Sequence, residues 1–128
     1  MMKARQTLAL IAATIWSTAA LAHDGMGPHG GRLADTGTHH LELVVTKDKI
    51  DVFVSTKASS PIAANDLTGL AIIVANGAST RIALAASGEK LTGQASAPLA
   101  DDAKPIVRVK LADGQTIQAS FDEAASAR

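Results

Sequence analysis

The chain has 128 residues, a formal net charge of zero from 12 basic and 12 acidic side chains, and no cysteine. This length suits one domain with its own core, and the lack of cysteine excludes a disulfide framework, a thiolate metal site and lipidation on cysteine. Balanced charge, with no basic stripe and few aromatic residues, argues against nucleic acid and gives no reason to expect binding to a membrane surface.

The first 22 residues have the features of a secretory signal peptide. Lys3 and Arg5 form a positive region, Leu8–Trp16 an apolar region and Ala20–Ala22 a small-residue cleavage site. The apolar run is shorter than the roughly 20 residues of a membrane span. We therefore expect cleavage after Ala22 and a periplasmic protein that begins at His23 and does not insert in the membrane, with an uncleaved anchor as the alternative.

Residues 23–38 predict an irregular lead rich in histidine and glycine, and residues 39–121 predict a single β-domain. Apolar residues alternate with polar ones over short runs, which is the period of a half-buried strand. Asn76-Gly77 favours a tight hairpin turn. We expect seven short strands, at about 41–45, 50–54, 70–74, 81–84, 91–95, 106–111 and 116–121.

Short strands joined by turn signals, without a long helical period, favour an all-β fold of the antiparallel β-sandwich class, similar to immunoglobulin domains. A small, partly open barrel is the alternative, and residues 122–128 predict a frayed tail. The residues expected to be buried are Ile50, Val52, Val54, Leu70, Ile72, Val74, Ile82, Leu84, Val107, Val109 and Phe121.

All four histidines of the chain lie between His23 and His40. Imidazole is the commonest protein ligand for zinc, copper and nickel, so this clustering indicates metal binding. The alternative is a polar lead whose histidines bind nothing.

His40 and Glu42 are two residues apart on a predicted strand, so their side chains share the face turned away from the core. They can converge on one ion if a loop supplies further ligands, although a solvated strand face explains the same pair. His29 lies between Pro28 and two glycines, which permits a tight turn that aims its ring at the strand, unless the segment is only a flexible linker. His39 has the opposite parity to His40 and ranks last as a ligand.

His23 gains a further possibility from cleavage after Ala22. A histidine at the N-terminus offers an α-amine and an imidazole in one chelate ring, which suits the planar nitrogen set favoured by Cu(II). The alternative is that an arbitrary residue follows the cleavage site.

Catalysis has little support in the sequence. His39-His40-Leu41-Glu42 lacks the spacing of a zinc-protease helix, and no nucleophile set or phosphate loop is present. A copper oxidase or oxygenase built on His23 ranks third among the hypotheses, because the mature chain offers few aromatic residues for a substrate face. We expect no enzymatic activity.

The segment Gly27–Leu43 resembles the small periplasmic domain of adaptor (membrane fusion) subunits in heavy-metal efflux pumps. The matching positions are Pro28, His29, Gly30, Gly31, Arg32, Leu33, Leu41 and Glu42. The chain has no coiled-coil hairpin or lipoyl-like segment, so we expect a stand-alone protein rather than an adaptor. Adaptor domains often lack a histidine at the position of His40, so their ligand set does not transfer whole. The resemblance implies a β-rich periplasmic domain in divalent-ion or copper handling.

These features favour a periplasmic metal-ion-binding protein that acts in buffering, delivery or efflux. The expected ion is copper, zinc or a similar divalent transition metal, and the expected ligands are His29, His40, Glu42 and His23. A component of a heavy-metal efflux system is the expected protein partner. The alternative hypothesis is a metal-free β-sandwich interaction module that docks to an envelope protein.

Overall fold

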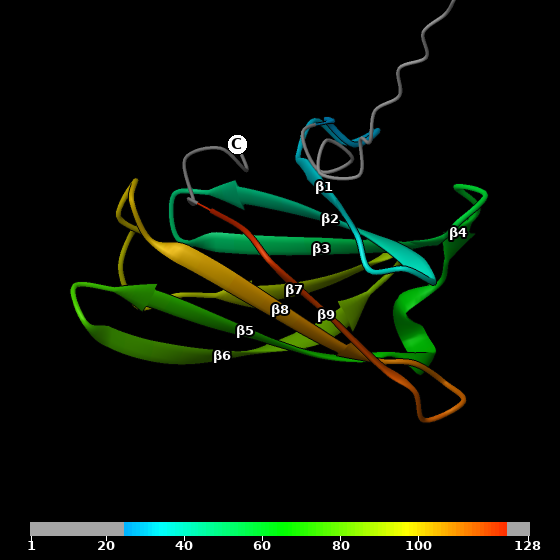
Figure 1. The fold of residues 1–128 in the computed structure, drawn as a ribbon. Coiled ribbons are helices and arrows are strands. Elements are labelled where there is room, and N and C mark those ends of the chain that lie inside the picture. The colour runs from blue at the N-terminus through cyan, green and yellow to red at the C-terminus, as the bar shows by residue number, and fades with distance from the viewer. Residues whose placement is uncertain (1–24, 123–128) are drawn as a thin grey trace, which may run out of the picture.

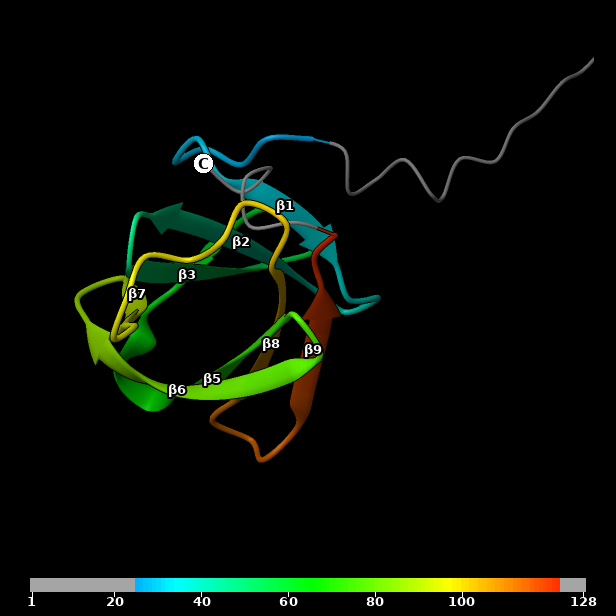
Figure 2. The ribbon, with the colours of Figure 1, turned by 90° about the vertical axis from the view of Figure 1, so that its left-hand side faces the viewer.

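The computed structural model describes residues 25–122 and consists of an antiparallel β-sheet that curls nearly into a barrel (Figures 1 and 2). The described part contains one 3₁₀ turn, at Ala64–Asp66, and no longer helix. Residues 25–122 form nine strands: β1 (Arg32–Asp35), β2 (His39–Thr46), β3 (Lys49–Thr56), β4 (Pro61–Ile62), β5 (Thr68–Ala75), β6 (Ala78–Ser87), β7 (Lys90–Gln94), β8 (Lys104–Lys110) and β9 (Thr116–Ser120).

The strands follow the order β1-β2-β3-β7-β6-β5-β8-β9, with β4 paired to β3. The sheet turns its corner at β6, where residues 78–84 pair with β5 and residues 85–87 pair with β7. One long strand therefore belongs to two ladders and carries the sheet around the core. The remaining edges, β1 and β9, approach each other without pairing, which leaves the barrel open there.

The predicted all-β class is confirmed, but the seven-stranded sandwich is not. A sandwich needs two sheets that are packed face to face. Here β7 pairs with β3 on one side and with β6 on the other, so the two layers are one continuous sheet. The open barrel, weighed above as the alternative, describes the architecture better. Two observed strands were not predicted: β1, inside the predicted lead, and β4, between the strands predicted at 50–54 and 70–74.

The predicted core is confirmed in every strand but one. Of the residues expected to be buried, those in β3, β6, β8 and Phe121 are buried, whereas Leu70, Ile72 and Val74 in β5 are only half-buried. Ala71 and Ile73 face the core instead. A continuous apolar run carries no parity signal, so the sequence does not tell which face of β5 is covered.

Several predictions about the chain ends fall outside the described residues. These are the signal peptide over 1–22, the residue His23 and most of the tail over 122–128. The strand β1 also divides the predicted lead, because it pairs with β2 over its full length and so belongs to the β-domain. No helix within residues 25–122 is long and apolar enough to cross a membrane.

Candidate metal-binding site

The segment before β1 forms a tight hairpin. The backbone N–H of Gly30 donates to the carbonyl of Gly27 over 3.0 Å, and the N–H of Gly27 donates to the carbonyl of Gly31 over 2.8 Å. Pro28 occupies the second position of this turn, where its fixed φ fits, and Gly30 has a φ of 81°. Beyond the turn, Met26 pairs with Arg32. The glycine-rich motif is therefore the turn of a hairpin whose second strand is β1.

Glu42, in the middle of β2, fixes this hairpin to the sheet. Its side chain is 2% exposed and is the only buried charged group within residues 25–122. Oε2 accepts the backbone N–H groups of His29 and Gly31, each over 2.8 Å, and Oε1 lies 2.8 Å from Nδ1 of His29. Three hydrogen bonds compensate the burial of the carboxylate. These contacts explain why a charged residue, Glu42, is buried beneath the hairpin.

Two glycines are required because the hairpin lies directly on β2. A Cβ at Gly27 would overlap the carboxyl group of Glu42, and one at Gly31 would overlap the carbonyl oxygen of Leu43. An alanine at either glycine position would therefore push the hairpin away from β2. The two glycines are needed because the backbone of the hairpin lies in close contact with β2.

Replacement of Gly31 by alanine is expected to lower the free energy of unfolding by about 2 kcal/mol, because the new methyl group meets backbone, which cannot move aside as a side chain can. Urea denaturation of both proteins measures the difference. Ser96→Ala, in the exposed bend that follows β7, is the control and should change stability by less than about 0.5 kcal/mol. Equal stability of G31A and the parent would show that the hairpin does not pack as described.

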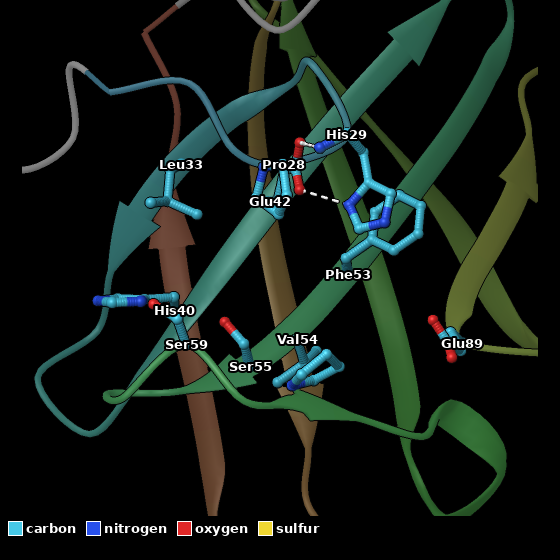
Figure 3. Close-up of a pocket in the computed structure, with 11 residues that line it drawn as sticks. Pro28, His29, Leu33, His40, Glu42, Phe53, Val54, Ser55, Ser59 and Glu89 are labelled. Atoms are coloured by element: carbon cyan, nitrogen blue, oxygen red, sulfur yellow. Dashed lines mark hydrogen bonds and ion pairs between the residues drawn. The ribbon is translucent and has the colours of Figure 1, made fainter.

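The ring of His29 lies flat over Phe53 in β3, with ring centroids 3.6 Å apart and an angle of 7° between the planes (Figure 3). A carboxylate only accepts hydrogen bonds, so the contact with Glu42 assigns the ring proton to Nδ1. In the neutral ring, Nε2 then keeps its lone pair. The His29 side chain is 43% exposed, so the ring is accessible from outside.

His40 lies on the same outer face of β2 but contacts a different carboxylate. Its ring points away from His29 (Figure 3), and its Nε2 is 3.7 Å from Oδ2 of Asp35 in β1. Oδ1 of Asp35 accepts the N–H of Gly37 over 2.8 Å, and Oδ2 lies 3.1 Å from Nζ of Lys57. The Gly37 amide and then Lys57 hold the pKa of Asp35 below its usual value, so this carboxylate is ionised at neutral pH.

A small cavity of about 80 Å³ lies on this outer face and is lined by both His29 and His40. Most of its wall is apolar, from residues such as Pro28, Leu33 and Phe53. Pockets for organic ligands have volumes of about 300 Å³ or more, so this cavity suits an ion or a few waters better than a substrate.

The structure brings together only part of the predicted ligand set. His29 and Glu42 are in direct contact, while His40 shares their face and cavity but pairs with Asp35. No group of three or more His, Asp, Glu or Cys side chains within the described range is placed to hold a metal ion. His23 lies outside that range. His39 lies away from the cavity, with Nδ1 2.9 Å from the hydroxyl of Thr38.

Two features of the site were missed by the sequence analysis. Glu42 was expected on the face turned away from the core, as a metal ligand or as part of a solvated strand face, but the hairpin covers it. Asp35 was not considered at all, although its place just before Thr36 and Gly37 is a signal for a tight turn that returns the chain to His40.

Comparison of the chain with known proteins finds no matching family model and no similar curated protein. The resemblance to the efflux adaptor domain therefore depends on the motif over residues 27–43 alone.

Proposed function

We propose that this protein is an exported, non-enzymatic binder of a divalent transition metal ion, copper or zinc, that acts in metal buffering, delivery or efflux in the periplasm. The candidate ligands are the histidines of the outer face, His29 and His40, with His23 from the segment before the hairpin. A component of a heavy-metal efflux system remains the proposed protein partner, on the strength of the motif resemblance.

The observation that carries this proposal is the contact between the buried Glu42 carboxylate and Nδ1 of His29. Histidines that bind metals usually donate their second ring N–H to a carboxylate, which fixes the tautomer and the orientation of the ring. Here the same arrangement leaves the lone pair of Nε2 free in the neutral ring, on a side chain that is 43% exposed. The stacking on Phe53 further restricts the ring.

Glu42 has the role of a positioning residue in this proposal rather than that of a ligand. Its two oxygens already accept two backbone N–H groups and one imidazole N–H. An ion bound to the carboxylate would have to break one of these bonds and loosen the hairpin. We therefore assign the metal to the imidazoles and the orientation of His29 to Glu42.

Titration calorimetry of the natively processed protein with ZnCl₂ and CuCl₂ tests the proposal. We expect a stoichiometric complex that survives gel filtration, and His29→Ala should weaken it at least tenfold, about 1.4 kcal/mol. His39→Ala is the matched control, because His39 contacts Thr38 and lies away from the cavity. Failure to bind either ion, or equal losses in the two variants, would contradict the proposal.

A metal-free interaction module is the second candidate, and one observation favours it. The hairpin motif is accounted for by its packing on Glu42 and Leu43, and the adjoining cavity is mostly apolar. In that case the outer face of β1 to β3 docks an envelope protein, and the calorimetry shows no metal binding.

A further inference from the structure

One half of the barrel is basic on its outer face. The strands β5, β6, β8 and β9 contain four basic residues and no acidic one. The four basic side chains are exposed and belong to Arg81, Lys104, Arg108 and Lys110. The net charge of zero for the whole chain therefore conceals an uneven distribution of charge over the folded surface.

An aliphatic stripe runs along the middle of this basic face. β5 lies between β6 and β8, and its alternate residues point outward. Ile106 of β8 lies opposite Ile72 and joins them. The stripe consists of four half-buried side chains, Leu70, Ile72, Val74 and Ile106. Arg81 lies opposite Ile72 on the β6 side. Arg108 lies opposite Leu70 on the β8 side, so basic residues flank the stripe on both sides.

No carboxylate within residues 25–122 lies within ion-pair distance of these four basic side chains. Nε of Arg108 donates to the amide oxygen of Gln118 over 3.1 Å. Nζ of Lys104 donates to the backbone carbonyl of Asp122 over 3.3 Å. Both acceptors are neutral, so the positive charges of the face remain uncompensated.

Acidic side chains occur in the turns beyond the ends of these strands. Asp66 and Asp113 line a hollow at one end of the barrel. Glu89 lines the cavity beside the N-terminal hairpin, on the other half of the barrel. Asp101 and Asp102 belong to the turn that precedes β8. The charges on the face itself are therefore of one sign.

A hollow on the basic face suits an anionic group. It has a volume of about 240 Å³ and is lined by Thr68, Gly69, Leu70, Arg108, Lys110 and Thr116. Lys110 lies opposite Thr68 in β5 and opposite Thr116 in β9, so a threonine is its neighbour on each side. Ammonium and guanidinium donors beside hydroxyl groups suit the oxygens of a phosphate.

We propose that the basic face, the outer surface of β5, β6, β8 and β9, binds the surface of a bilayer that contains anionic phospholipid. The outside of a sheet that curls nearly into a barrel is convex, so the aliphatic stripe can touch a flat boundary (Figure 2). The stripe then contacts the edge of the acyl region, while the long basic side chains reach the phosphates. Each basic residue near an anionic bilayer contributes about fivefold in affinity, and salt screens this attraction.

Other occupants fit this face less well. A second copy of the same face would bring four positive charges against four, which repel one another. A peptide cannot add a strand at β5, because both edges of β5 are already paired. Protein interfaces are enriched in aromatic anchors, and the four strands of this face contain no aromatic residue.

This inference goes beyond metal binding and does not depend on it. The cavity lined by His29 and His40 lies on the outer face of β2 and β3, across the barrel from β5 (Figure 2). A protein that rests on a bilayer through the basic face keeps this cavity turned toward the solution. An ion can therefore still reach the imidazoles of the bound protein.

Vesicle sedimentation of the natively processed protein, without added metal, tests the inference. We expect binding to vesicles of equal parts phosphatidylglycerol and phosphatidylcholine, none to phosphatidylcholine alone, and release in about 0.5 M NaCl. Arg81→Gln with Lys110→Gln removes one charge on each side of the stripe. This pair should lower the partition coefficient by about twentyfold, because each charge contributes about fivefold.

Lys47→Gln with Lys57→Gln is the matched control, because it removes two exposed charges from the ends of β2 and β3. It should lower binding less than about threefold, since the opposite layers of a sheet lie about 10 Å apart, beyond the screening length of about 8 Å. Equal losses in the two pairs, or equal binding to the two kinds of vesicle, would overturn the inference. Binding to soluble polyglutamate but not to vesicles would also overturn it and assign the face to an acidic protein. The proposed function is decided separately, by the calorimetry with zinc and copper.

Discussion

Glu42→Ala is expected to lower the free energy of unfolding by about 3 kcal/mol. The substitution leaves the backbone N–H groups of His29 and Gly31 without acceptors, and the N–H of Gly31 is buried. Each unsatisfied buried donor costs about 1–3 kcal/mol, and the removed side chain also leaves a void beneath the hairpin. Relief from burying a charge offsets only part of this loss, because the carboxylate is well compensated in the parent. Chemical denaturation followed by circular dichroism measures the change.

A second carboxylate provides the control for this measurement. Glu89 is exposed between β6 and β7, so Glu89→Ala should change stability by less than about 0.5 kcal/mol. Hydrogen exchange adds a local readout, since in Glu42→Ala the amides of His29 and Gly31 should lose their protection while those of the core strands keep it. If the two alanine variants are equally stable, Glu42 does not hold the hairpin.

The strands β2 and β3 could be predicted because every second residue is apolar, although Val44 and Phe53 add an apolar residue on the other face. Leu41, Leu43 and Val45 in β2 are buried, as the period of two requires. The alternation does not show which strands pair with one another in the sheet. The link that makes one sheet of two layers depends on the short β7, which pairs with both β3 and β6, and its sequence carries only a weak pattern. A sandwich and an open barrel therefore look alike in the sequence.

The candidate site was predictable only in part, because strand parity gives the face of a residue but not what covers that face. The parity of β2 correctly placed His40 and Glu42 on one face, opposite the buried leucines. Parity cannot show that a hairpin folds back over that face, because this depends on the turn at Gly30 and on backbone contact with the strand. The burial of Glu42 follows from that return of the chain, whereas the pairing of His40 with Asp35 follows from the separate turn that joins β1 to β2.

Glu42→Gln should separate the orientation of His29 from the integrity of the fold. The amide oxygen of glutamine can still accept the N–H groups of His29 and Gly31, so we expect a loss of only about 1 kcal/mol in stability. The amide nitrogen, however, would face Nδ1 of His29 and donate to it. The ring proton then moves to Nε2, and the nitrogen proposed to bind the ion loses its free lone pair.

The metal affinity of Glu42→Gln should therefore fall by about tenfold to a hundredfold, the usual effect of losing the carboxylate behind a histidine ligand, and should match that of His29→Ala. Imidazole ¹⁵N chemical shifts provide an independent readout, because they report which ring nitrogen carries the proton. Parent-like affinity together with a moved proton would show that His29 is not a ligand. Reduced affinity with the proton still on Nδ1 would show that Glu42 acts through its charge. Only the joint change of tautomer and affinity supports a carboxylate that prepares an imidazole for the ion.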